Sequence, residues 1–212
     1  ASGAKGGVAL SLYRAPDDPE NFWALFLQQL VDVYAPLGVH HWVIWENIDV
    51  PAGQPATRFE GDIPSYAQMV RISHGVFTSS DETARIYLGG LAQTINPQTE
   101  PYLRQFIDEL QNDAASATNG FYFDGVTMNF LVRPTITDNM TLSTDAVLPA
   151  IAQTQQILQE AGLSDKTVWI TELSASPTLD QIDGLSGAPV RLIPMQQADF
   201  IVQGTALALA AG

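Results

Sequence analysis

The 212-residue chain is predicted to be an α/β protein in which short buried strands alternate with amphipathic helices around a parallel sheet. Five apolar runs of strand length alternate with longer runs of helical periodicity, at a spacing of roughly 35 to 45 residues. No glycine-rich phosphate loop follows the first run, and Gly89 and Gly90 lack the dinucleotide-binding spacing. These observations favour a TIM-like (β/α) barrel over an open doubly wound sheet, as a single domain over residues 1–212.

The expected strands are apolar runs without strict alternation, typical of strands that are buried on both faces of a parallel sheet. They are Gly7–Tyr13, His41–Trp45, Ala84–Leu91, a stretch within Gly120–Leu131, and Thr167–Thr171.

The expected helices carry apolar residues at near-helical spacing along one stripe. They are Pro19–Tyr34, Ser65–Phe77, Pro101–Ala115, Ala146–Ala161 and Met195–Ala211. Gly162 is expected to end the fourth helix as its C-cap.

The composition limits the classes of partner and chemistry. With 23 acidic and 9 basic residues the net charge is −14, so nucleic acid and anionic membranes are repelled, whereas neutral sugars are compatible. The absence of cysteine excludes disulfides, thiol catalysis and cysteine zinc sites. No apolar run reaches the length of a membrane span, and Ala1–Gly7 does not read as a signal peptide. We expect an extracellular or cell-surface protein.

Four strand motifs and one helix motif stand out in chain order. They are WVIWENID (Trp42–Asp49), ARIYLGGLA (Ala84–Ala92), FYFDGVTMNF (Phe121–Phe130), VWITELSASP (Val168–Pro177) and QQADFIVQGTALALAAG (Gln196–Gly212). Together they resemble strands four to seven, and the helix before strand eight, of clan A (β/α)8-barrel glycoside hydrolases, the cellulase/β-xylosidase-like superfamily. The resemblance implies that Gly7–Tyr13 is strand three, so that about five units, strands 3 to 7, are present.

The first two β/α units and the last one are then outside this sequence. A five-stranded arc would leave two open sheet edges, which a closed barrel does not have. Three explanations stay open: a piece of a longer chain, completion by a further polypeptide, or a fold that seals itself differently. We favour the first.

Glu172 is the main candidate for catalysis. It directly follows an apolar strand, and catalytic groups of such barrels lie at the carboxyl ends of strands. Taken on its own it also fits a solvated residue at the start of a loop, but the resemblance implies that it is the nucleophile. A retaining glycosidase needs a second carboxyl group about 5 Å away.

The acid/base position is altered. Where the family shows Trp-Asn-Glu-Pro, this chain has Trp45, Glu46, Asn47 and Ile48, so the ungapped alignment puts Asn47 on the acid/base glutamate. An amide cannot donate a proton to a leaving group. Glu46 could do so only if a bulge shifted the strand end by one residue, because adjacent strand residues point to opposite faces. Asp49 is a further substitute.

The remaining candidates would bind substrate. Asn129 and Leu131 stand where the resemblance implies a His-x-Tyr pattern. Trp45 and Asn47 lie beside Glu46, and Arg133 and Tyr13 are candidates for the rim, whereas Trp42 and Trp169 are expected in the core. The histidines lack the grouping of a metal site, so no metal and no cofactor are expected.

The resemblance therefore implies a glycoside hydrolase that cleaves a β-linked saccharide with retention. The alternative is a catalytically inactive barrel, a pseudoenzyme that acts as a carbohydrate-binding or structural protein in an assembly.

Overall fold

The computed structural model describes residues 7–53, 57–92, 100–132, 144, 147–175 and 194–211. Four parallel strands form one sheet in the order β1-β2-β3-β4: β1 (His41–Glu46), β2 (Arg85–Leu91), β3 (Gly125–Val132) and β4 (Thr167–Ala175). The helices are α1 (Phe22–Tyr34), α2 (Ile63–Ser80), α3 (Tyr102–Gln111), α4 (Val147–Glu160) and α5 (Pro194–Ala210). Two short 3₁₀ helices, η1 (Ala35–Leu37) and η2 (Ala117–Tyr122), precede β1 and β3.

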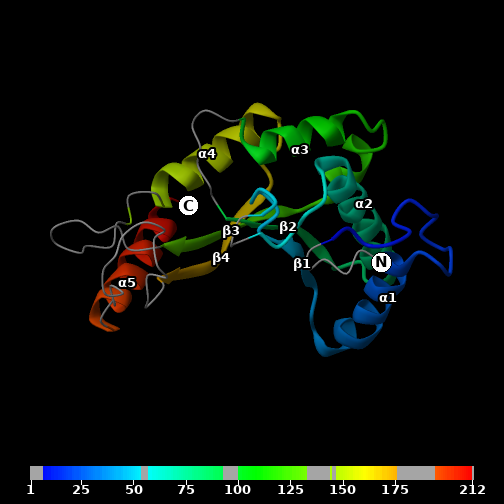
Figure 1. Cartoon of the computed structure of the whole chain (residues 1–212), viewed down its shortest axis with the longest axis horizontal. Coiled ribbons are helices and arrows are strands. Elements are labelled where there is room, and N and C mark those ends of the chain that lie inside the picture. The colour runs from blue at the N-terminus through cyan, green and yellow to red at the C-terminus, as the bar shows by residue number, and fades with distance from the viewer. Residues whose placement is uncertain are drawn as a thin grey trace.

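The helices lie in an arc around one side of the sheet. Each helix contacts the next along the chain, and Figure 1 shows them passing around the sheet from α1 to α5. Because each parallel connection carries a helix over the same side, the strands share a helix-covered outer face. The alternation of strands and helices expected from the sequence is therefore confirmed.

The other face of the sheet is concave. The ring centroids of His41 on β1 and Trp169 on β4 are 5.2 Å apart, although β2 and β3 lie between them. Three strand spacings in a flat sheet would separate these strands by about 14 Å. Tyr87 on β2 joins the pair, with its centroid 4.4 Å from that of Trp169. The sheet is therefore curved in the sense of a barrel wall, which is compatible with part of a TIM-like barrel.

The main core fills the space between the outer face of the sheet and the helices. Its largest fully buried side chains include Tyr66 and Phe77 of α2 and Phe106 of α3, which cover Ile86 and Leu88 of β2. Trp42, expected in the core, is buried there and stacks on Phe77 with centroids 4.4 Å apart.

Side-chain caps set two helix starts that differ from the sequence prediction. The Asn21 side chain accepts the Ala24 N–H at 3.1 Å, and Asp62 accepts the Ser65 N–H at 2.9 Å. These caps satisfy N–H groups that have no partner within the helix, so α1 begins later than expected and α2 earlier. Gly162 has a φ of +75°, as expected for a left-handed C-cap after α4.

The expected strand at Gly7–Tyr13 is wrong. The segment forms turns, with a φ of +59° at Ser11 and a bond from the Arg14 N–H to the Ser11 carbonyl at 3.0 Å. Leu12 is buried against the core, and its carbonyl accepts from the Gln68 side chain of α2. The segment is therefore held by Leu12 and its contact with α2 rather than by pairing beside β1, and the described sheet has four strands, not five.

Both ends of the arc carry exposed apolar surface. Within the described residues the outer edges of β1 and β4 pair with no further strand. On α1 the exposed large apolar residues include Phe22, Leu25, Phe26 and Val33, on a stripe distinct from its buried face. Contiguous exposed apolar surface of this kind is typical of a face that binds another polypeptide. Completion of the barrel by further polypeptide stays a prediction, and these two ends are where it would bind.

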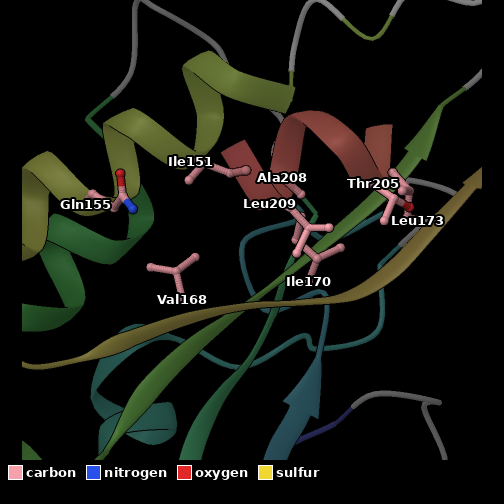
Figure 2. A pocket seen from close by; sticks show the side chains of 8 residues that line it. All are labelled: Ile151, Gln155, Val168, Ile170, Leu173, Thr205, Ala208 and Leu209. Atoms are coloured by element: carbon pink, nitrogen blue, oxygen red, sulfur yellow. The ribbon is translucent and has the colours of Figure 1, made fainter. Parts of the chain in front are cut away.

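A pocket of about 390 Å³ lies on the outer face of the sheet, between α4, β4 and α5 (Figure 2). Its walls are mostly apolar side chains such as Ile151, Ile170 and Leu209, and its polar lining comes from Gln155 and Thr205. A saccharide needs many hydrogen-bonding groups, so this pocket does not suit one. It lies on the opposite face of β4 from the concave side.

One hydrogen bond between a histidine and a carboxylate at the amino end of the sheet yields a pH prediction. His40 Nδ1 lies 2.7 Å from Asp81 Oδ2, and the Thr83 hydroxyl donates to Asp81 Oδ1 at 2.6 Å. The hydrogen bond with His40, and then that from Thr83, lower the pKa of Asp81 from 3.8 to about 2. Because the folded-state pKa is lowered, the stabilisation is present above pH 3.8 and is lost as the pH falls towards about 2.

We expect Asp81→Asn to destabilise the protein at neutral pH and to weaken the loss of stability over that acidic range. Urea unfolding followed by circular dichroism, at neutral pH and at several acidic values, measures both effects. The exposed Asp17→Asn is the matched control. Parallel stability-versus-pH curves for Asp81→Asn and the unmodified protein would contradict the prediction.

Candidate functional site

The carboxyl ends of β1 and β4 each carry one candidate carboxyl group. Glu46 is the last residue of β1 and is exposed, whereas Glu172 lies within β4 and is half-buried. The Ser174 hydroxyl donates to Glu172 Oε1 at 2.9 Å. Both glutamates are thus at the end of the sheet where barrel enzymes hold their catalytic groups.

A bulge in β4 sets the direction of Glu172. Ile170 pairs with Met128 and Glu172 pairs with Asn129, so Thr171 is an extra residue in β4. Ile170 and Leu173 both pack against the outer core, which leaves Thr171 and Glu172 between them on the concave side. Bulges are common beside active sites because they redirect a side chain.

The end of β1 shows a second departure from regular alternation. Trp45 has a φ of +70° and Asn47 a φ of +47°. Ile44 and Trp45 both pack against the outer core, so the alternation shifts by one residue and the exposed Glu46 falls on the concave side. A positive φ is tolerated by asparagine but costs a bulky residue such as tryptophan about 1–3 kcal/mol. The regular alternation that counted against Glu46 is therefore interrupted at Trp45, and the role of Glu46 as the acid/base stays a prediction.

Contacts with α2 and β2 hold this strand end. The Tyr66 hydroxyl is fully buried, donates to the Ile44 carbonyl at 2.7 Å and accepts the Gly89 N–H at 2.8 Å. A Cβ on Gly89 would lie 2.5 Å from the Ile44 carbonyl oxygen and 2.7 Å from the Trp45 carbonyl carbon. Glycine at position 89 thus permits the close approach of β2 to the turned end of β1.

Two buried amides lie between the glutamates. Asn47 and Asn129 are 8% and 6% exposed, and the Asn129 Nδ2 donates to the Asn47 Oδ1 at 2.9 Å. Thr171 Oγ1 donates to the Asn129 Oδ1 at 2.7 Å. The structure thus brings Asn47 and Asn129 together, and their role in binding substrate stays a prediction. Thr171 is an addition that the sequence did not suggest.

Trp45 lies in a different environment from the one a sugar subsite requires. Its ring centroid is 6.0 Å from that of Trp23 and 5.9 Å from that of Phe59, and its Nε1 donates to the Arg58 carbonyl at 2.7 Å. It packs on the helix side of the sheet. Stacking of Trp45 on a sugar stays a prediction, and these contacts favour a core role.

The other predicted residues lie apart from this cluster. Tyr13 is 69% exposed and its hydroxyl is 3.4 Å from that of Ser65 at the start of α2, so it does not end a strand. Arg133 lies outside the described residues. Asp49 Oδ1 accepts the Ala92 N–H at 2.7 Å, which ties the loop after β1 to the end of β2.

The sequence interpretation missed the aromatic layer on the concave face. Trp169, expected in the core, is 39% exposed and packs with Tyr87 and His41. The signal was available in the alternation of β4, because Trp169 lies two residues before Thr171 and therefore shares its face. In a curved parallel sheet such inward residues form layers that fill the barrel interior.

No group of three or more histidine, aspartate or glutamate side chains that could hold a metal occurs within the described ranges. None of the helices that the structure describes is long and apolar enough to cross a membrane.

Comparison with known proteins shows the fold alone. No known family profile matches the sequence, and no curated protein has significant sequence similarity to it. Among solved structures, a glucosidase from Croceicoccus marinus superimposes with a TM-score of 0.59 at 15% sequence identity. The match covers 95% of this chain and 36% of the glucosidase chain, so this chain spans about a third of that protein. The chain thus has a glycosidase-like fold.

Proposed function

We propose that this chain is part of a glycoside hydrolase that cleaves a β-linked saccharide with retention of anomeric configuration. Glu172 attacks the anomeric carbon, and Glu46 protonates the leaving oxygen and then deprotonates water. The shift of alternation at Trp45 is the observation that carries the proposal, because it turns Glu46 towards the same concave side as Glu172. The clan A affiliation and the family's roles for these residues belong to the proposal as well.

The composition of the site supports a neutral saccharide as the substrate. The two carboxylates have amide and hydroxyl neighbours in Asn47, Asn129 and Thr171, which suit sugar hydroxyls as hydrogen-bonding partners. The likeness to part of a glucosidase agrees with a carbohydrate ligand.

A mechanism-based label tests the proposal. The protein is incubated with aryl β-glycosides and with a 2-fluoro aryl glycoside, whose covalent glycosyl-enzyme is slow to hydrolyse. We expect release of the aryl group and one sugar adduct, which peptide mass spectrometry maps to Glu172. An adduct on another residue would reject the assigned nucleophile.

The alternative is an inactive barrel that binds carbohydrate or serves a structural role in an assembly. Its support is the buried Asn47, which holds the position of the family's acid/base glutamate in the ungapped alignment and cannot donate a proton to a leaving group. Sugar binding by calorimetry, without hydrolysis or labelling of any of these substrates, would favour this alternative over the enzyme.

A further inference from the structure

A chain of three hydrogen-bonded side chains crosses the carboxyl end of the sheet. Thr171 on β4 donates to Asn129 on β3 at 2.7 Å, and Asn129 donates to Asn47, directly after β1, at 2.9 Å. We call these three residues the amide bridge. Strand β2 lies between Asn129 and Asn47, so the bridge connects the two outer strands of the described sheet.

The ends of the amide bridge are the sequence neighbours of the two candidate carboxyl groups. Thr171 directly precedes Glu172, and Asn47 directly follows Glu46. A constraint on the distance between Thr171 and Asn47 therefore also limits how far Glu46 and Glu172 can move apart. Backbone hydrogen bonds do not join β1 to β4 directly, because these strands pair with β2 and β3 and not with each other.

Strand β2 has a glycine and a register shift at the point where the amide bridge crosses it. A Cβ on Gly90 of β2 would collide with the Asn129 side chain, so the crossing requires glycine at this position. The register of β2 against β3 also shifts between Leu88 and Leu91, the stretch that contains Gly90. Because Asn47 and Asn129 are buried, breaking a bond of the bridge would remove a hydrogen bond from a buried amide, which is unfavourable.

We propose that Asn129 is a positioning residue that fixes the separation of Glu46 and Glu172. The inference rests on the proposed function only for the roles of the two glutamates. An amide suits this place because it accepts from Thr171 and donates to Asn47 at the same time. Retention requires carboxyl groups about 5 Å apart, and displacements of about 1 Å in an active site lower rates by roughly 100-fold.

The test uses Asn129→Ala and the milder Thr171→Val. Thr171 is exposed, and its replacement by valine removes one hydrogen bond of the bridge. Thr127→Val is the matched control, because its buried hydroxyl donates to the Leu88 carbonyl and not to the bridge. The readout is the distance between the carboxyl groups of Glu46 and Glu172 in crystal structures of the unmodified protein and of each variant.

We expect the same distance between the two carboxyl groups in the unmodified protein and in Thr127→Val, and a distance longer by about 1 Å or more in Asn129→Ala and Thr171→Val. On an aryl β-glycoside, kcat should fall by about 10- to 100-fold in the two bridge variants, with KM changed by less than about threefold. Near-ultraviolet circular dichroism confirms that each variant is folded, and Thr171→Val keeps the test valid if Asn129→Ala does not fold.

The outcomes separate this inference from the proposed function. An unchanged distance between the two carboxyl groups in both bridge variants overturns the positioning role even if hydrolysis is found. A longer distance between the two carboxyl groups in the bridge variants, without hydrolysis of any substrate, supports the positioning role and rejects the enzyme.

Discussion

Replacing Glu172 by glutamine is expected to lower hydrolysis of an aryl β-glycoside by a factor on the order of 10⁴ or more. Glutamine is nearly isosteric and keeps an oxygen to accept from Ser174, so the bulged end of β4 should persist. It is a poor nucleophile, so the glycosyl-enzyme should not form at this position. Initial rates measured with a chromogenic substrate, together with the melting temperature, separate lost chemistry from lost folding.

Two further variants sharpen that result. Glu46→Gln should lower hydrolysis of an unactivated disaccharide by about 10²–10⁴-fold and that of a dinitrophenyl glycoside far less, because a dinitrophenolate leaves without a proton. Glu82→Gln, at an exposed position before β2, should change neither rate. Full activity of Glu172→Gln would refute the assigned nucleophile. If Glu46→Gln loses the same fraction of its hydrolysis rate on both substrates, the role of Glu46 as the acid is refuted.

Replacing Phe106 by alanine is expected to destabilise the protein by about 3–5 kcal/mol. Phe106 is fully buried on α3, where its ring centroid is 5.3 Å from that of Tyr66 and 6.4 Å from that of Phe123. The truncation removes buried apolar contacts and leaves a cavity beneath the helix layer. Because domains are stable by only about 5–15 kcal/mol, this loss is a large fraction of the total.

Phe22→Ala on α1 is the matched control. Phe22 is 53% exposed, so its truncation should change the free energy of unfolding by no more than about 0.5 kcal/mol. Urea denaturation monitored by tryptophan fluorescence measures both variants. A small effect at Phe106 would contradict the core described for α2 and α3, and a large effect at Phe22 would indicate that the exposed face of α1 is covered in solution.

The helices and most strands could be predicted from local patterns. Leu103, Phe106, Ile107 and Leu110 form a buried stripe on α3 at helical spacing, and the fold class follows from the alternation of such stripes with short apolar runs. Gly7–Tyr13 shows the limit of this reasoning. An apolar run of strand length also fits a segment that packs one residue, Leu12, into a core, and only the contacts with α2 distinguish the two.

At the site, the sequence by itself determined that Glu172 lies in a strand near its carboxyl end, because an apolar run directly precedes it. It also identified Glu46 and Asn47 as an inverted pair, but it could not determine the conformation of the strand end that carries them, where Trp45 has a positive φ. This backbone geometry comes with contacts far along the chain, from the Tyr66 hydroxyl and from the close approach of Gly89. The alternation of side chains along a strand is a local rule, whereas a bulge or a positive φ is stabilised by tertiary partners. The tertiary structure alone therefore decided the direction of both carboxyl groups.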